Sequence, residues 1–275
     1  MAVTRRAILN GLLGAGATML GGTGAYGFFY SRHQLEITRA TLPVMKLPPA
    51  LSGLRIGLIT DVHRSLWVTD DDVRRAVAMI MREAPDVIVL GGDYVTWGDR
   101  DYVRAAAEAL GPLHAPFGVF GILGNHDDDR DMPAALAAKG VQMLKDARTT
   151  VNVKGEAVDF IGIRYWTKRG SDIASIVRGA TGFPVLLAHD PRRLAEAAAL
   201  KISLMLSGHT HGGQIVLPGL GAIAKQKFPV LAGPARRGQT TLFVSRGVGT
   251  VYVPIRINCP PEIAILTLMP DPHSA

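Results

Sequence analysis

Residues 86–93 read Asp86-Val-Ile-Val-Leu-Gly-Gly-Asp93, a short apolar run that ends on a carboxylate. Such a run bounded by Asp and Gly predicts a buried β-strand, and its two glycines predict a tight turn directly after it. Residues 54–61 repeat the pattern and end on Asp61. Three more apolar runs, over 117–123, 184–188 and 202–206, stop just before an amide or imidazole side chain: Asn125, His189 and His209.

Helical patterns separate these runs. Thr69 is placed to cap a helix that extends through about Met81, with three aspartates in its first turn. Further helices are expected over 101–110, 172–179 and 191–199, and further strands over 148–153 and 157–164 and near 214–217, 241–245, 250–254 and 262–268. Residues 218–240, rich in Gly and Pro, are expected to form a long loop. This alternation predicts a sheet with helices on its faces, whose functional groups collect beyond the carboxyl ends of the strands.

Length, charge and cysteine content exclude some classes of protein. The chain has 275 residues and a formal charge of +7, but residues 1–32 supply three arginines and no acid. The remaining 27 basic and 23 acidic side chains are spread along the sequence without basic runs, so no specific nucleic-acid partner is expected. The single cysteine, Cys259, excludes an intrachain disulfide framework.

The N-terminus has the pattern of a targeting signal. Arg5 and Arg6 precede an apolar stretch, rich in Gly and Ala, that extends to about Tyr30. This pattern predicts a twin-arginine export signal in residues 1–32, ahead of one catalytic domain over 33–275. Two cleavage positions, near Ala17 and near Ala25, remain open. An uncleaved segment is long enough to stay as a membrane anchor, and a plain anchor is the alternative. Both readings place the domain in the periplasm or on the outer face of the cytoplasmic membrane.

Five of the eight histidines lie at or just past the predicted strand ends: His63, His126, His189, His209 and His211. Imidazoles mixed with carboxylates, and without cysteine, are typical ligands of Mn, Fe or Zn. An extended Asp61-x-His63 would point both side chains at one ion. The glycines after His211 would let the two rings of the His-x-His pair diverge to different ions. Asp93 can bridge two ions, and Asn125 offers a neutral oxygen.

The order of these blocks, D-x-H, G-D, G-N-H, H and G-H-x-H, resembles the calcineurin-like metallophosphoesterase superfamily. Three further stretches resemble its bacterial branch of exported, twin-arginine-dependent phosphoesterases: His209 through Gln214, Ser245 through Gly249, and Arg256 through Ile263. The match spans roughly residues 50–268 and contains every block in order.

The resemblance implies an α/β fold, a four-layer αββα sandwich with two central mixed β-sheets. It implies two divalent metal ions, the first held by Asp61, His63, Asp93 and His211, and the second by Asp93, Asn125, His189 and His209. His126 would be the catalytic acid or phosphate-binding group. The implied reaction is hydrolysis of phosphomonoesters or phosphodiesters by a water that bridges the two ions, with no covalent phosphoenzyme. Substrate-binding residues are not predicted.

One departure from the family pattern narrows the class. Protein phosphatases of the superfamily read G-D-Y-V-D-R-G, whereas residues 92–98 here read G-D-Y-V-T-W-G. Thr96 replaces the acid that orients the catalytic histidine, which argues against a phosphoprotein substrate. Asp127 or Asp128 could orient His126 instead, or the acidic run could be a solvated loop.

Four other side chains have two readings each. Trp67 and Trp97 would line the substrate cleft or, as the preferred reading, cover the core. Arg246 and Arg256 would bind phosphate or form structural ion pairs.

Three alternative functions remain beside the exported phosphoesterase. A UDP-diacylglucosamine-type pyrophosphohydrolase acting on a nucleotide-linked lipid would suit a retained anchor, but its substrate is cytoplasmic. A nuclease would need a basic channel interleaved with aromatic residues, which the sequence lacks. A metal-binding envelope protein without turnover would not need His126. The physiological ester, the native metals and the oligomeric state are not specified by the sequence. Export machinery for folded proteins and a membrane contact through the N-terminus are the expected partners.

Overall fold

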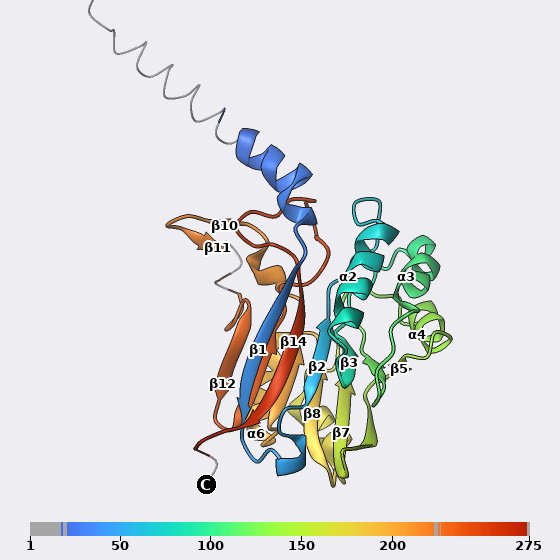
Figure 1. The fold of residues 1–275 in the computed structure, drawn as a ribbon, viewed down its shortest axis with the longest axis vertical. Coiled ribbons are helices and arrows are strands. Elements are labelled where there is room, and N and C mark those ends of the chain that lie inside the picture. The colour runs from blue at the N-terminus through green and yellow to red at the C-terminus, as the bar shows by residue number, and fades with distance from the viewer. Residues whose placement is uncertain (1–17, 19–20, 223–224, 226, 274–275) are drawn as a thin grey trace, which may run out of the picture.

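The computed structural model describes the chain except residues 1–17, 19–20, 223–224, 226 and 274–275. The predicted twin-arginine pair therefore lies outside the described residues. The described chain begins with a helix over 21–29 that projects from one end of the molecule (Figure 1). Within the described ranges, no helix is both long enough and apolar enough to cross a membrane.

Two six-stranded mixed sheets form the centre of the molecule. The first, in spatial order, contains β1 (Glu36–Val44), β14 (Glu262–Pro270), β2 (Arg55–Ile59), β3 (Val87–Leu90), β4 (Val119–Gly121) and β5 (Gln142–Met143). The second contains β12 (Gly233–Arg237), β13 (Thr240–Val244), β9 (Leu204–Ser207), β8 (Phe183–Ala188), β7 (Glu156–Ile163) and β6 (Ala147–Val153). A small hairpin joins β10 (Val216–Leu217) to β11 (Gly221–Ala222).

Alternation along the strands builds three cores and four layers. In β3, Ile88 and Leu90 pack under the helices, whereas Val87 and Val89 face the second sheet. The helices over the first sheet are α2 (Asp70–Arg82), α3 (Val103–Leu110) and α4 (Asp131–Ala137), and those over the second are α5 (Gly170–Val177) and α6 (Leu194–Ala199). The predicted αββα sandwich with two mixed sheets is confirmed.

Helix α2 begins where its sequence indicates. The Thr69 hydroxyl accepts from the Asp72 amide, and the Asp72 carboxylate accepts from the Thr69 amide at 2.9 Å. This reciprocal capping box satisfies two of the amides that a helix start leaves without partners. It fixes the end of the loop that leaves the first ligand-bearing turn.

Several elements differ from the sequence-based expectation. Residues 250–254 form bends rather than a strand, and residues 218–240 contain β11 and β12 within the expected loop. Strand β1 was not predicted because most of its residues are polar or half-exposed. Pairing with β14 over nine residues holds it at the edge of the sheet. Helix α4 was missed because it begins in the acidic run.

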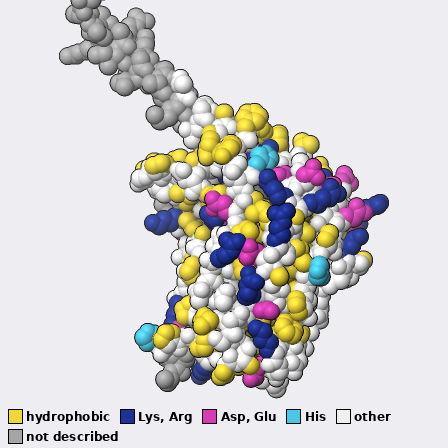
Figure 2. Space-filling view, in the orientation of Figure 1, with side chains coloured by type: hydrophobic (Ala, Val, Ile, Leu, Met, Phe, Trp, Pro, Cys, Tyr) yellow, Lys and Arg dark blue, Asp and Glu magenta, His cyan; other side chains and the backbone are white. Residues whose placement is uncertain are grey.

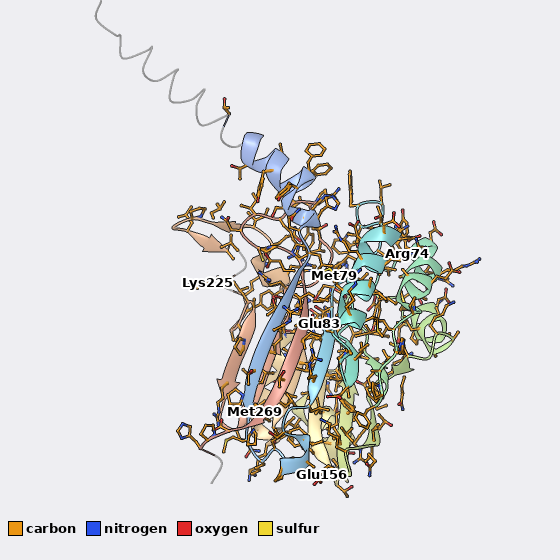
Figure 3. The ribbon with its side chains drawn as sticks, in the orientation of Figure 1. Arg74, Met79, Glu83, Glu156, Lys225 and Met269 are labelled. Atoms are coloured by element: carbon orange, nitrogen blue, oxygen red, sulfur yellow. The ribbon has the colours of Figure 1, made fainter. Side chains whose placement is uncertain are left out.

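Charged side chains of both signs are interspersed over the face shown in Figure 2. Met269, near the end of β14, lies at the end of the molecule opposite the N-terminal helix (Figure 3).

Candidate metal centre

The predicted ligands lie in the loops that follow β2, β3, β4, β8 and β9. Five of them take left-handed backbone angles, with φ between 50° and 72°: Asp61, His63, Asp93, His209 and His211. Residues other than glycine rarely adopt this conformation, and such strain concentrates at functional sites. The expectation that Asp61-x-His63 is extended is therefore wrong. Turned backbone, rather than strand alternation, brings both side chains to one place.

Six of the seven predicted ligands gather in two groups, in which every residue except the half-buried His209 is buried. Asp61, His63 and His211 form the first group, and Asp93, His189 and His209 form the second. In each group one ligand atom per residue lies within 4.8 Å of the others. The His-x-His pair is divided between the groups, as expected. Asn125 follows β4, and its buried Oδ1 has no hydrogen-bond partner among the residues that the structure describes.

The second group has the arrangement that a cation would stabilise. His189 Nδ1 donates to the Gly91 carbonyl oxygen at 2.7 Å, so in the neutral ring Nε2 carries a lone pair. That Nε2 lies 3.1 Å from Asp93 Oδ2 and 3.8 Å from Asp61 Oδ1. A lone pair facing two carboxylates is repulsive unless a proton or a metal ion lies between them. The donor set therefore fits a divalent ion.

The first group shows the same feature in its imidazoles. His63 Nε2 and His211 Nε2 lie 3.1 Å apart, and His63 Nε2 lies 3.5 Å from Asp93 Oδ2. Two ring nitrogens that face each other beside a carboxylate converge on a point between them. Asp93 is thus within reach of both groups, as a bridging ligand must be.

Burial keeps most of these rings neutral. It lowers the pKa of His63 to about 3 and that of His209 to about 4, and it lowers the pKa of His211 well below its usual value. Burial also opposes protonation of His189, but Asp93 and Asp61 raise its pKa to about 10. A metal ligand must be a neutral imidazole, so metal binding at His189 would release a proton.

The carboxyl groups of Asp61 and Asp93 have pKa values shifted in opposite directions. Burial raises the pKa of Asp61 to about 6, although His189 works in the opposite direction. Burial would also raise the pKa of Asp93, but the neighbouring His189 outweighs it and holds that pKa well below its usual range. Asp93 is therefore the firmly ionised carboxylate of the centre.

Outer contacts fix the ligand rings. The Thr96 hydroxyl lies 3.1 Å from His63 Nδ1, so the residue that departs from the phosphatase pattern positions a predicted ligand rather than His126. Asp127 accepts from the backbone amides of Asp93, Tyr94 and Gly124 at 2.7–2.8 Å. It ties the second ligand loop to the third and does not orient His126.

His126 is oriented by a backbone amide. The Trp97 N–H donates to His126 Nδ1 at 3.1 Å, which places the proton of the neutral ring on Nε2. The Trp97 and His126 rings lie 4.4 Å apart, edge to face, and the His63 ring lies 5.0 Å from His126. Burial lowers the pKa of His126. Asp128 instead accepts from the amides of Arg130 and Asp131, so it does not orient the ring either.

Two clefts open beside the centre and share the wall formed by residues 251–253. One, of about 510 Å³, includes Trp67, Thr96 and Trp97 in its lining. The other, of about 340 Å³, includes His209, His211, Lys227 and Phe228. Trp67 is 46% exposed and Trp97 is 67% exposed, so the preferred reading that they cover the core is wrong.

The sequence-based reasoning missed Tyr252, which is 78% exposed and lies on both clefts. The glycines of residues 247–249 and Pro254 were the signal for a loop at this position.

The two arginines have structural roles. Arg246 forms ion pairs with Glu262 at 2.8 Å and Glu36 at 3.1 Å, which agrees with the ion-pair reading. Arg256 is fully buried and donates six hydrogen bonds to backbone carbonyl oxygens, including those of Gly247 and Gly249. It therefore binds neither substrate phosphate nor a carboxylate partner.

Comparison with known proteins identifies the family to which this chain belongs. The sequence profile of the calcineurin-like phosphoesterase family matches residues 54–213. The "Uncharacterized metallophosphoesterase YkuE" of Bacillus subtilis is 30% identical over 97% of this chain and 98% of its own length. "Phosphodiesterase YaeI" of Escherichia coli is 29% identical over 78% of this chain and 82% of its own length. Among solved structures, the NAD nucleotidase of Haemophilus influenzae shares the fold with a TM-score of 0.50 and 14% identity, over 71% of this chain and 45% of that chain.

Proposed function

Because the chain belongs to the calcineurin-like phosphoesterase family and is thus a metal-dependent phosphoester hydrolase, we propose that it cuts phosphodiesters outside the cytoplasm. The observation that carries the choice of diesters is the pair of clefts beside the metal centre that lie on either side of residues 251–253. A diester has two organic arms, and each cleft can receive one of them. The relative named as a phosphodiesterase also supports this choice.

The seven predicted ligands would hold the two ions. Asp61, His63 and His211 would bind the first and His189, His209 and Asn125 the second, with Asp93 shared between them. Nitrogen-rich ligands without a thiolate favour Mn, Fe or Zn. When bound, such an ion pair supplies an activated water at neutral pH and neutralises charge on the phosphoryl oxygens.

His126 would donate a proton or a hydrogen bond to the departing oxygen. Because its Nδ1 accepts from the Trp97 amide, the neutral ring offers Nε2–H. Desolvation of this buried ring strengthens such a donor relative to the same group in water. The two clefts would orient the ester arms so that one departing oxygen faces this ring.

The first test measures which esters are cut and where. We expect the Mn- or Zn-loaded full chain to hydrolyse bis-p-nitrophenyl phosphate about tenfold or more faster, in kcat/KM, than p-nitrophenyl phosphate, because only the diester can occupy both clefts. The metal-free chain is the control. A faster monoester would overturn the choice of diesters.

The same diester, which carries a charge and crosses membranes poorly, tests location. The support for location outside the cytoplasm is the sequence of residues 1–32, with Arg5 and Arg6 ahead of an uncharged stretch. Intact cells that produce the chain should hydrolyse added diester. Cells that produce a variant with both arginines replaced by lysine should do so only after lysis. Activity that is latent until lysis in both strains would contradict export.

Replacing His126 by asparagine is expected to lower kcat for an alkyl phosphodiester by about 10²–10⁴-fold while two ions remain bound. The loss should be smaller with p-nitrophenyl esters, since their departing group needs little protonation. Steady-state kinetics on both esters, with metal content by mass spectrometry, provide the readout. Trp97→Phe is the matched control because it retains the amide that orients the ring. Equal losses on both esters would exclude protonation of the departing oxygen by His126.

A further inference from the structure

A group of exposed apolar side chains extends from the N-terminal helix to the larger cleft beside the metal centre. This apolar rim consists of Tyr26, Phe29, Tyr30, Leu66, Trp67, Trp97, Tyr252 and Val253, which are 43–78% exposed. Figure 2 shows apolar side chains gathered at the end of the molecule from which the N-terminal helix projects. A contiguous exposed apolar surface of this kind marks a site that a protein partner or a membrane covers.

The rim is continuous from the N-terminal helix to the catalytic histidine. The Phe28 ring lies 5.7 Å from Trp67. Five rim residues line the larger cleft: Leu66, Trp67, Trp97, Tyr252 and Val253. Trp97 lies 5.4 Å from Tyr252 and 4.4 Å from His126, measured between ring centroids. Whatever covers the rim therefore lies directly beside the reacting centre.

The helix is fixed to the body with its apolar face outward. Gly27 packs so closely that an added Cβ would lie 2.6 Å from Ile255, and the Arg256 amide donates to its carbonyl at 3.3 Å. Tyr26, Phe29 and Tyr30 are spaced i, i+3 and i+4, so they share the face that is turned away from the body.

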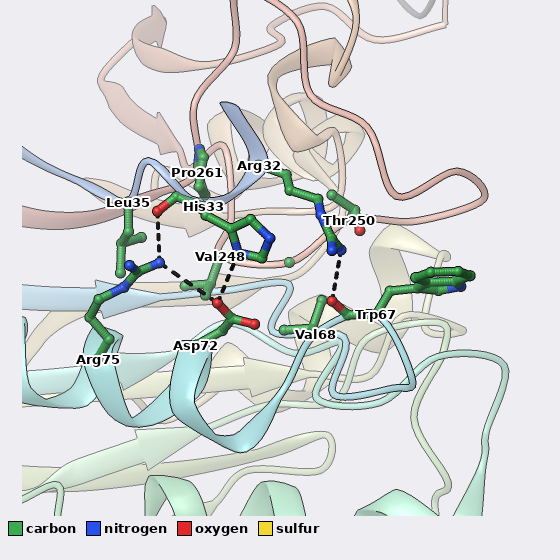
Figure 4. A pocket seen from close by; sticks show the side chains of 11 residues that line it. Arg32, His33, Leu35, Trp67, Val68, Asp72, Arg75, Val248, Thr250 and Pro261 are labelled. Carbon is green, nitrogen blue, oxygen red and sulfur yellow. Dashed lines mark hydrogen bonds and ion pairs between the residues drawn. The ribbon is translucent and has the colours of Figure 1, made fainter. Parts of the chain in front are cut away.

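Polar contacts below the helix lock this orientation. Arg32 donates to the Trp67 carbonyl at 2.8 Å, and His33 pairs with Asp72 at 3.2 Å (Figure 4). Arg75 donates to the His33 carbonyl at 2.7 Å. The rim residues of the helix and those of the cleft thus belong to one rigid surface.

The neighbouring sequence indicates what covers the rim. Residues 7–30 contain no charged side chain, and this uncharged stretch leads directly into the rim. About 20 such residues suffice to enter a bilayer. Trp and Tyr are the side chains that settle at the boundary between lipid and water, and the rim contains five of them: Tyr26, Tyr30, Trp67, Trp97 and Tyr252. Arg32 and Lys227, next to the rim and its neighbouring cleft, suit lipid phosphates.

We propose that the apolar rim rests in the interfacial layer of a lipid bilayer and that the metal centre takes its phosphodiester from an amphiphile in that layer. The second part rests on the proposed function. The apolar arm of the amphiphile would pass along the Trp67 and Trp97 cleft, and the polar arm would occupy the cleft that contains Lys227. Docking would place the scissile phosphate at headgroup depth, level with the opening of the centre.

Docking is tested by tryptophan quenching, which needs no turnover. The full chain, with Trp166→Phe so that only Trp67 and Trp97 report, is bound to phosphatidylcholine–phosphatidylglycerol vesicles whose acyl chains are brominated. We expect strong quenching of the bound protein. Tyr26→Glu with Phe29→Glu should remove most of it, because charge on the helix face opposes insertion. Met269→Glu, at the opposite end of the molecule, should not. A vesicle-bound protein without quenching would overturn docking and would leave the N-terminus as a simple tether to a rim that another protein covers.

The substrate class is tested in the same vesicles without bromine. Hexadecyl p-nitrophenyl phosphate, embedded in the vesicles, should have a kcat/KM about tenfold or more above that of soluble methyl p-nitrophenyl phosphate. The Tyr26→Glu, Phe29→Glu variant should lose this advantage and keep its activity on the methyl ester. Equal rates for the two esters in the wild type would overturn the amphiphile. Hydrolysis of neither ester would count against the proposed function instead, while the quenching result still decides docking.

Discussion

Replacing Asp93 by asparagine is expected to lower kcat/KM by about 10³-fold or more and to reduce the bound metal below two ions per chain. The reason is position: Asp93 Oδ2 lies 3.1 Å from His189 Nε2 and 3.5 Å from His63 Nε2, so one carboxylate serves both groups of ligands. Asparagine keeps the shape and the oxygen but removes the negative charge. Two cations close together need that charge more than they need any single imidazole.

The measurement is metal content by mass spectrometry beside steady-state kinetics on the diester. Asp71→Asn is the matched control, because the Asp71 side chain is 93% exposed at the start of α2, where it pairs with Arg74. It should bind and turn over like the wild type. An Asp93→Asn variant that retains two ions and wild-type activity would show that Asp93 is not the bridging ligand.

The sequence predicted the parts of the centre that depend on local pattern. Apolar runs that end in Asp61, Asp93 and His189 indicate strand ends whatever the rest of the chain does, because a buried strand must stop where a polar side chain meets the sheet edge. Thr69 and Asp72 indicate the start of α2 for the same reason, since the capping box is contained within four residues. The alternation of these elements predicts a sheet with helices on its faces, whereas the four layers were implied by the resemblance to the family.

The rest depends on contacts between distant residues. Residues 251–253 alternate like a strand, but the Gln214 amide donates to the carbonyls of Val251 and Val253 at 3.0 and 2.9 Å and accepts from the Val251 amide. A side chain far away in sequence thus uses the backbone groups that a neighbouring strand would need. Tyr252 is left exposed as a result, with φ of 62°. Local propensity contains no trace of Gln214. Gly247, Gly249 and Pro254 indicate a loop nearby, but they do not give its path or the clefts on either side.

The left-handed ligands are a second feature that local pattern cannot supply. His209 has φ of 72°, and its amide donates to both Asp61 oxygens at 3.0 Å. Gly208 is needed beside it, because an added Cβ there would overlap the Asp61 carboxylate. The ligand loops shape one another across the sheet, and that mutual fit exists only in the folded chain.

Arg256→Met is expected to lower the free energy of unfolding by about 3–5 kcal/mol, since each buried carbonyl left without a partner costs about 1–3 kcal/mol and some will find new ones. Arg256 is fully buried, and its guanidinium donates to five carbonyls, those of His211, Arg246, Gly247, Gly249 and Cys259. Methionine fills a similar volume without any donor. Arg256→Lys keeps the positive charge but has fewer donors. Its free energy of unfolding should therefore lie between those of the wild type and Arg256→Met.

Arg256→Met should also weaken metal binding. Arg256 holds the carbonyl of His211, a ligand, and those of Gly247 and Gly249. An added Cβ at Gly247 would lie 2.5 Å from Asp61 Cβ, and one at Gly249 would lie 2.9 Å from His63 Cβ. The backbone segments at His211, Gly247 and Gly249, which pack around the first group of ligands, are thus held together by one side chain. Weaker metal binding should accompany the lower stability, and chelation should then destabilise the variant less than it destabilises the wild type.

Urea unfolding of the metal-loaded and metal-free proteins measures both effects. Arg104→Met is the matched control, because the Arg104 side chain is 89% exposed and pairs with Glu108 one helical turn away. Such surface pairs contribute about 0.2–1 kcal/mol, so this change should stay within that range. If Arg256→Met unfolds at the same urea concentration as Arg104→Met, the carbonyls around Arg256 do not depend on it. The framing of the first metal group would then have to come from the sheet alone.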